Sequence, residues 1–314
     1  IKRTSLSTYR SQRRGGRGVQ GASSRDEDFV EHLFVANTHS YILFFTDKGK
    51  CYWVKVYDIP EGGRAAKGRA IVNLIGCEPD EKVSAFISVK EFHEDHFVVM
   101  ATEKGIVKKT KLSAYSNPRK KGIYAVEIRD GDRLIEARVS TGDNDILLGT
   151  RNGKSIRFSE EQIRPSGRKT MGVKGITLSS EDDRLVGMLL IKREGTTVLV
   201  ATEKGFGKRT EISQYRAQKR GGKGVLTMKT TEKVGKMVTI KEVVDKDDLM
   251  IITNQGVLIR QPVAQIRAIG RATQGVKLIK LGEGTLVSSI TRIMTEEEKK
   301  EDGEESNSEK PSEG

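Results

Sequence analysis

The chain contains few cysteines, few prolines and no long apolar run. Two cysteines, Cys51 and Cys77, are too few for a disulfide framework, which favours a reducing cytoplasm. No apolar run reaches the roughly 18 residues of a membrane helix, and the polar, arginine-rich segment after Ile1 is unlike a signal peptide. Six prolines against 33 glycines are unlike a collagen-like chain. We therefore expect a cytoplasmic globular protein with no membrane partner, and a first residue other than Met suggests a piece of a longer polypeptide.

Acidic residues are outnumbered by basic ones. The 314 residues include 56 Lys and Arg against 43 Asp and Glu, which gives a formal net charge of +13. An excess of this size favours a polyanion as the partner.

The acidic residues are concentrated at the end of the chain. Glu296–Gly314 holds nine Asp or Glu and three Lys, with no apolar residue. Such a composition predicts a disordered acidic tail, so we expect a folded domain over 1–295 and a tail over 296–314. The tail is interpreted either as a solubilising terminus or as an intramolecular competitor for the anion that the basic body binds.

Two glycine motifs recur along the chain. The first is Thr-x-x-Gly, at Thr46–Gly49, Thr102–Gly105, Thr150–Gly153, Thr202–Gly205 and Thr253–Gly256. The second is a later glycine, at Gly18, Gly68, Gly122, Gly172, Gly224 and Gly275, and successive members lie 50 to 54 residues apart. A period held over the whole chain is typical of a repeat architecture.

Each repeat is predicted to consist of strands. The expected strands are rich in β-branched and aromatic residues: Leu33–Asn37, Tyr41–Thr46, Lys50–Lys55, Ala70–Leu74, Ser84–Val89, Phe97–Thr102, Ile106–Thr110, Leu185–Lys192, Val198–Thr202 and Phe206–Thr210. Glycine after a two-residue polar turn suits a hairpin that needs a positive φ. Six four-stranded units predict an all-β, propeller-like closed ring, because each small sheet buries its faces only against its neighbours. Ile1–Thr4 aligns with Gly207–Thr210, and Leu286–Ile293 resembles a unit's opening strand, so the two ends are expected to share one blade.

Cations recur in phase at the bend before each second glycine. Arginine stands four residues ahead of that glycine in five units, and Pro118 takes the place in the sixth. The predicted DNA-binding residues at these bends, beyond the first, are Arg64, Lys67, Arg69, Arg119, Lys120, Lys121, Arg168, Lys169, Lys174, Lys219, Arg220, Lys223, Arg271 and Lys277. Equivalent bends of a ring lie at equivalent positions, so the sequence predicts a basic belt. Arginine forks and glycine N–H groups suit phosphate oxygens, and with no helix to enter a groove, we expect binding without base readout.

The first bend holds the most specific motif, Gln12-Arg13-Arg14-Gly15-Gly16-Arg17-Gly18, and a variant copy occupies 218–224. It resembles the seven-residue box of the C-terminal domain of the DNA gyrase A subunit. The resemblance covers essentially the whole chain and implies a six-bladed β-pinwheel that binds double-stranded DNA on its rim and wraps it in the right-handed sense needed for negative supercoiling. It further implies that this part is non-catalytic and holds no cofactor. The catalytic tyrosine, the ATP and Mg sites, the rest of the gyrase A subunit, and the gyrase B subunit of an A2B2 enzyme then lie outside the chain, in a bacterial, nucleoid-associated assembly.

Other interpretations are weaker. Within the DNA class, a domain that only positions DNA, as in topoisomerase IV, is disfavoured by the intact box; a propeller-type scaffold for acidic proteins is the alternative from another class. Gly16-x-Gly18-x-x-Gly21 fits a dinucleotide fingerprint but has no flanking strand and helix. His93-Glu94-Asp95-His96 is interpreted as a polar turn rather than a metal site. Tyr9, Tyr115 and Tyr215 share one repeat position, where packing between blades is favoured over stacking on DNA.

Overall fold

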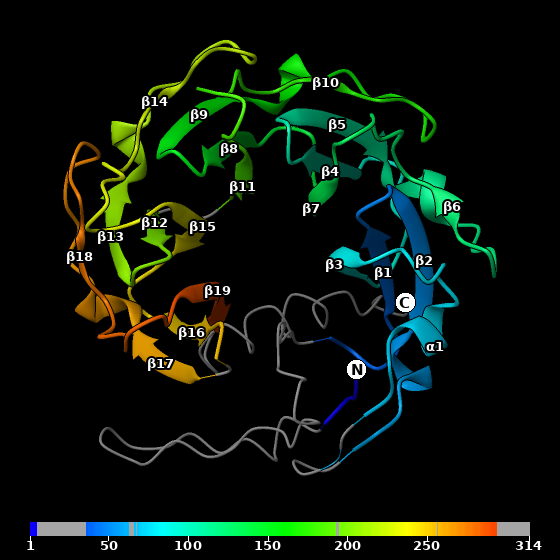
Figure 1. Ribbon diagram of the computed structural model, residues 1–314. Helices are drawn as coiled ribbons and strands as arrows, with labels where there is room; N and C mark the ends of the chain where they lie inside the picture. The colour runs from blue at the N-terminus through cyan, green and yellow to red at the C-terminus, as the bar shows by residue number, and fades with distance from the viewer. Residues whose placement is uncertain (5–35, 63–65, 67, 193–194, 256, 294–314) are drawn as a thin grey trace, which may run out of the picture.

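The computed structural model describes residues 1–4, 36–62, 66, 68–192, 195–255 and 257–293. Within these residues the strands form five antiparallel sheets, which Figure 1 shows arranged around a common centre. The chain is an all-β propeller of the pinwheel type, as its sequence predicted. In the described part, the single α-helix has four residues, and no helix is long and apolar enough to cross a membrane.

Each sheet contains one hairpin, and in blades 1, 2 and 4 its bounds agree closely with the predicted strands. The hairpins are β1 Tyr41–Thr46 with β2 Lys50–Lys55, β4 Phe97–Thr102 with β5 Ile106–Lys111, β8 Asp145–Thr150 with β9 Lys154–Ser159, β12 Thr197–Thr202 with β13 Phe206–Glu211, and β16 Asp248–Thr253 with β17 Leu258–Pro262. The Thr-x-x-Gly motif explains their turns. The turn glycine has a φ of 78° at Gly49 and 81° at Gly105. The preceding threonine hydroxyl accepts a backbone hydrogen bond, as Thr102 does from Ile106.

Each sheet, or blade, is completed by strands that come later in the chain. The inner strands are β3 Val83–Val89, β7 Leu134–Ser140, β11 Leu185–Ile191, β15 Met237–Val243 and β19 Val287–Ile293. The outer strands have two residues each: β6 Ile123–Tyr124, β10 Val173–Lys174, β14 Val225–Leu226 and β18 Val276–Lys277. Blade 1 is ordered β3-β1-β2-β6, blade 2 β7-β4-β5-β10, blade 3 β11-β8-β9-β14, blade 4 β15-β12-β13-β18 and blade 5 β19-β16-β17.

This connectivity differs from the expected self-contained units of about 50 residues. The outer strand β6 follows the hairpin of blade 2 in the chain but pairs with β2 of blade 1, Lys50 opposite Tyr124. Every outer strand therefore crosses back to the preceding blade, and adjacent blades are interlaced.

The expected assignment of the chain ends to one shared blade is wrong for the C-terminal strand. β19 pairs with β16 and completes the inner side of blade 5. Residues 1–3 lie instead beside the second bend, which ends at Gly68: Arg69 N donates to Ile1 O at 2.9 Å, and Arg3 N donates to Pro60 O at 3.0 Å. Ile1 and Arg69 thus pair in the same way as the second hairpin strand and the outer strand of the other blades.

A second local prediction is also wrong, because Ala70–Leu74 is not a strand. Residues Val72–Ile75 form α1, which ends at Gly76 with a φ of 63°. Ile75 is buried against Tyr52 and Val54 of blade 1. Packing of this apolar side chain onto the blade outweighs the strand preference of the β-branched residues.

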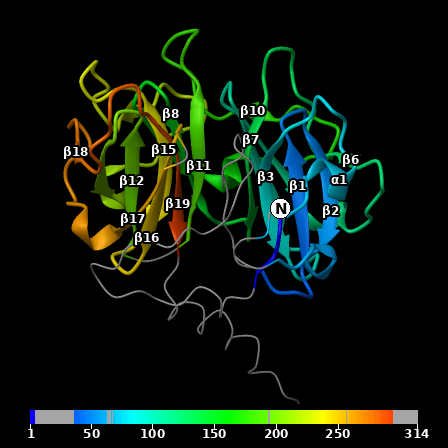
Figure 2. The same ribbon diagram turned by 60° about the horizontal axis from the view of Figure 1, so that its bottom comes forward.

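The core lies between blades rather than within one. Leu43 and Phe45 of blade 1 are packed in one cluster with Val98 and Met100 of blade 2. The inner strands of successive blades also lie side by side around the centre, as β11 and β15 do in Figure 2. Tyr115 and Tyr215 are 0% and 1% exposed, which confirms the packing interpretation for both. Tyr9 lies outside the described residues.

Candidate nucleic-acid interface

Each bend joins a short 3-10 helix to an outer strand, and its glycine is required by the backbone. The φ of Gly172 is 87° and that of Gly224 is 68°. A Cβ at these positions would lie 2.5 Å from Val107 O and 2.4 Å from Ser155 O. The second glycine of each repeat therefore lets the outer strand cross closely over the preceding blade.

The exposed cations of the bends follow the outer circumference. Figure 1 shows β6, β10, β14 and β18 along the outside of the ring. The predicted residues exposed there are Arg69, Arg119, Lys120, Lys121, Lys169, Lys174, Lys219, Lys223 and Lys277. The rim of the described blades thus presents exposed cations at each described bend.

Several predicted residues lie outside the described part of the chain. These are Gln12, Arg13, Arg14, Gly15, Gly16, Arg17 and Gly18 of the first box, together with Arg64 and Lys67. Their contact with DNA stays a prediction, as does the acidic tail over 296–314.

The variant box at 218–224 is described, and its arginine is partly used within the protein. Arg220 Nη1 donates to Lys174 O and Arg220 Nε donates to Gln162 O, both at 3.0 Å. The Gln162 amide oxygen also accepts the Arg220 backbone N–H at 2.9 Å. Arg220 therefore ties its bend to the preceding outer strand, a role that the sequence did not predict.

Arg271 repeats this arrangement one blade later. Its Nη1 donates to Leu226 O at 2.9 Å, and its guanidinium lies 5.9 Å from the centre of the Tyr215 ring. Arg168, Arg220 and Arg271 are all half-buried. Arg220 and Arg271 therefore tie their bends to the preceding outer strands, while the exposed lysines beside them present most of the accessible charge.

Sequence reasoning missed an exposed aromatic side chain among these cations. Tyr124 of β6 is 52% exposed, and Lys169 Nζ lies 5.9 Å from the centre of its ring. The outer strands have only two residues, so their periodicity gives no signal, and Tyr124 was recognisable only from its place two residues after Gly122.

Sequence reasoning also missed two lysines that lie beneath the bends. Lys108 and Lys208 are 1% and 0% exposed, and burial lowers the pKa of each to about 8, with Arg168 and Arg271 respectively adding repulsion. Both stand three residues after a hairpin glycine. The signal available in the sequence was a lysine at a strand position where the alternation of inward and outward side chains predicts an inward-facing residue.

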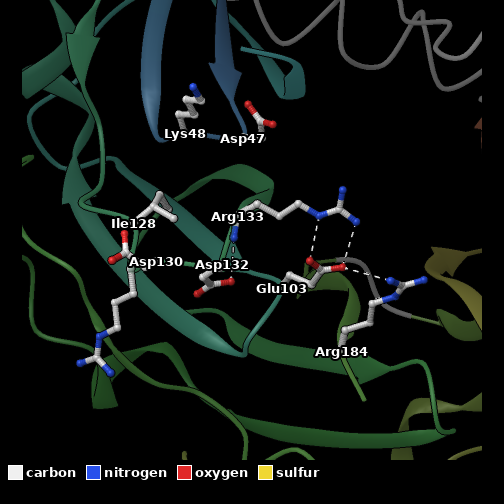
Figure 3. Close-up of a pocket in the computed structure, with 10 residues that line it drawn as sticks. Asp47, Lys48, Glu103, Ile128, Asp130, Asp132, Arg133 and Arg184 are labelled. Carbon is white, nitrogen blue, oxygen red and sulfur yellow. Dashed lines mark hydrogen bonds and ion pairs between the residues drawn. The ribbon is translucent and has the colours of Figure 1, made fainter. Parts of the chain in front are cut away.

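A polar pocket of about 700 Å³ lies apart from the bends, at the hairpin turns of blades 1 and 2 (Figure 3). Arg133 donates two hydrogen bonds of 2.9 Å to the Glu103 carboxylate, and Arg184 Nη1 lies 3.6 Å from Glu103 Oε1. The pocket lining also carries Asp47, Lys48, Arg129, Asp130 and Asp132. Four acidic and four basic side chains balance one another, so the pocket lacks the net positive charge of a polyanion site.

The histidine motif forms part of the connection between β3 and β4, with a turn at Glu94 and Asp95, as predicted. His96 Nδ1 lies 2.8 Å from Asp95 Oδ1. No group of three or more metal-ligating side chains is found in the described residues.

Comparison with known proteins identifies the family. Residues 1–37, 40–90, 96–141, 144–192, 196–243 and 247–293 match the family described as DNA gyrase C-terminal domain, beta-propeller. The chain is a propeller of this family: it belongs to the DNA gyrase C-terminal domains.

Curated relatives agree with this assignment. The chain is 48% identical over 300 residues to the DNA gyrase A subunit of Staphylococcus epidermidis, covering 95% of the chain and 34% of that protein. It is 46% identical over 314 residues to the corresponding gyrase protein of Staphylococcus aureus (strain MRSA252), covering 99% of the chain and 35% of that protein. It therefore spans about a third of the length of these relatives.

Solved structures support the fold. The C-terminal domain of DNA topoisomerase IV matches with a TM-score of 0.79 at 24% identity, covering 98% of this chain and 95% of that one. A DNA gyrase A C-terminal domain matches with a TM-score of 0.75 at 22% identity, covering 93% and 96% respectively.

Proposed function

We propose that the chain binds duplex DNA on its rim without sequence specificity and wraps it, as the non-catalytic DNA-wrapping domain of a gyrase A subunit. The observation that carries the proposal is the recurrence of exposed cations on the outer bends of successive blades. In this proposal the predicted residues of the bends contact phosphates rather than base edges, because strands and bends, not a helix, face the DNA.

Because duplex DNA is stiff, holding it in a bend requires cations spread along a belt rather than gathered in a single cluster. With a persistence length of about 150 bp, bending roughly 40 bp by about 180° costs on the order of 11 kcal/mol. Each phosphate contact releases counterions and offsets part of this cost. Lysines distributed over several bends supply such contacts along a curved path.

We further propose that the ring has six blades. The family matches the chain in six segments, and four of the five described sheets have an outer strand, whereas β17 of blade 5 has none among the described residues. Ile1–Arg3, beside Arg69, then belongs to the sixth blade.

A repeated inter-blade contact supports the same closure. Side chains at one hairpin position donate to carbonyl oxygens of the next repeat: Arg3 to Ile59 at 2.9 Å, Trp53 to Tyr115 at 2.8 Å, Arg157 to Tyr215 at 3.2 Å and Arg209 to Ile266 at 2.7 Å. Arg260 holds this position in β17. A closed ring gives Arg260 an equivalent acceptor in the first repeat.

The proposal also covers the larger assembly. In this proposal the domain works in the cytoplasm with a B subunit and with the rest of an A subunit, and the catalytic tyrosine, ATP and Mg belong to those other parts. A topoisomerase IV-like domain that positions DNA without wrapping is the alternative, and the fold similarity does not discriminate between the two.

A gel-shift series on unrelated duplexes of increasing length tests the binding step. We expect shifts on every sequence, with affinity rising until the duplex spans the rim. A chain that binds acidic proteins but no duplex at low salt would instead be an interaction scaffold.

A further inference from the structure

Two bends are held from beneath by a buried ammonium group. Lys108 Nζ donates to Ala125 O at 2.8 Å and to Arg168 O. Lys208 Nζ donates to Gly270 O at 2.7 Å, to Arg271 O and to Thr273 Oγ1 at 3.0 Å. Ala125 follows β6, whereas the other acceptors belong to the bends at 168–172 and 270–275, so each lysine reaches from its hairpin strand into the bend that crosses over it.

The same strand position alternates in character around the ring. The third residue after the hairpin glycine is Tyr52, Lys108, Ile156, Lys208 and Ile259 in blades 1 to 5. Lys2 holds this position in the aligned N-terminal segment, and its Nζ donates to Ala66 O of the second bend, which ends at Gly68, at 2.9 Å. Lysine therefore recurs beneath every second bend.

The bend above Ile156 is fixed in another way. It carries the glycine pair Gly221 and Gly222, and a Cβ at Gly222 would lie 3.4 Å from Ile156 Cδ1. Thr177 takes the place of the lysine: its hydroxyl donates to Gly221 O at 2.7 Å and its backbone N–H to Gly222 O at 2.9 Å. The described box-type bend, with two glycines, thus lies over an apolar residue, whereas the bends beginning at Arg168 and Arg271 lie over a lysine.

Resting on the proposed function, we propose that Lys108 and Lys208 are positioning residues for DNA binding: each holds its bend in the shape that directs the neighbouring exposed cations outward. A buried ammonium group is costly unless its N–H groups are bound. These lysines are bound through bend carbonyls, so the shape of the bend and the charge of the lysine depend on each other.

This dependence has a pH signature. Burial, and then repulsion from Arg168 or Arg271, lowers the pKa of both lysines to about 8, while Glu127 acts in the opposite direction on Lys108. The carbonyl acceptors of the bends and the phosphates of bound DNA both favour the charged form of these two lysines. DNA binding should therefore take up protons above about pH 8, and affinity should fall as the pH rises through that range.

The test uses the full chain with Lys108→Met and Lys208→Met combined. Lys204→Met is the matched control, since it removes an exposed lysine from the hairpin turn of blade 4. Binding of a 40-bp duplex is measured from pH 6.5 to 9.5, with proton uptake from calorimetry in two buffers. At pH 7 we expect about tenfold weaker binding for the double variant and a salt slope shallower by about 2, equivalent to two lost phosphate contacts. Above pH 8 the wild-type affinity should fall while that of the double variant stays flat.

A graft keeps the test decisive if the double variant does not fold. Lys208→Ile combined with Ala272→Gly, Thr273→Gly and Lys229→Thr recreates the bend of the variant box above blade 4. We expect this chain to bind DNA like the wild type at pH 7 with less proton uptake. The positioning role is overturned if the double variant behaves like Lys204→Met at every pH, if a folded graft fails to restore binding, or if wild-type binding takes up no protons. A wild-type chain that binds no duplex at all would overturn the proposed function instead.

Discussion

Lys109 Nζ lies 3.2 Å from Glu160 Oε1, and this ion pair joins β5 of blade 2 to the 3-10 helix that follows β9 of blade 3. The two side chains are 5% and 0% exposed. Ser140 donates to the second carboxylate oxygen of Glu160, and Asn144 Nδ2 donates to it at 3.3 Å. The buried carboxylate is thus paired with a cation at one oxygen and hydrogen-bonded at the other, inside an interface between blades.

Removing one partner of this pair should destabilise the ring. Lys109→Met leaves the Glu160 carboxylate buried without its counter-charge, which should lower the free energy of unfolding by about 3–5 kcal/mol in urea denaturation. Lys111→Met, at an exposed position of the same strand, is the control and should change it by less than about 1 kcal/mol. Combining Lys109→Met with Glu160→Met should recover much of the loss. A single variant as stable as the control would mean that the pair contributes nothing to the interface.

The hairpins were predictable from the sequence because their determinants are local. Thr46–Gly49 and its equivalents specify each turn, and alternation specifies the flanking strands. The interlacing was not predictable, because β6 pairs with a strand about 70 residues earlier and is too short to show a period. α1 was missed because the packing of Ile75 decides its structure. The rim lysines were identified from their phase in the repeat, whereas the internal contacts of Arg220 and Arg271 depend on carbonyl oxygens of another blade.

Salt should weaken DNA binding steeply. If the rim makes about ten phosphate contacts, log K should fall with log[salt] at a slope near −9 and depend little on base sequence. Fluorescence anisotropy on two unrelated duplexes at several salt concentrations measures both quantities. A flat salt response, or strong preference for one short sequence, would contradict binding through a belt of phosphate contacts.

The first box should matter more for topology than for affinity. Replacing Arg13, Arg14 and Arg17 by alanine removes three of many rim cations, yet it alters the contact where the proposed ring closes. We expect the variant to shift DNA but to lose most of its effect on linking number. Replacing Arg119, Lys120 and Lys121 by alanine removes the same charge from another bend and should reduce both properties together. If the box variant lost DNA affinity and its effect on linking number to the same extent, the box would be only one cluster of cations among several.

The acidic tail should compete with DNA. Its nine acidic residues outnumber its three lysines, and it is tethered to a basic body, so its effective concentration near the rim is in the millimolar range. Deleting Glu296–Gly314 should strengthen DNA binding at low salt, and the gain should shrink as salt screens the attraction. Equal affinities of the full and shortened chains at low ionic strength would leave only a solubilising role.

Ligation of nicked circular DNA in the presence of the purified chain tests the wrapping proposal most directly. The linking number of the sealed circles reports whether DNA is wrapped and in which sense. Wrapping in the sense of this family predicts a shift in linking number that grows with the protein-to-DNA ratio, with the sign of a right-handed wrap. Circles sealed with an unchanged linking number, at concentrations where the chain binds them fully, would show that it binds DNA without wrapping it.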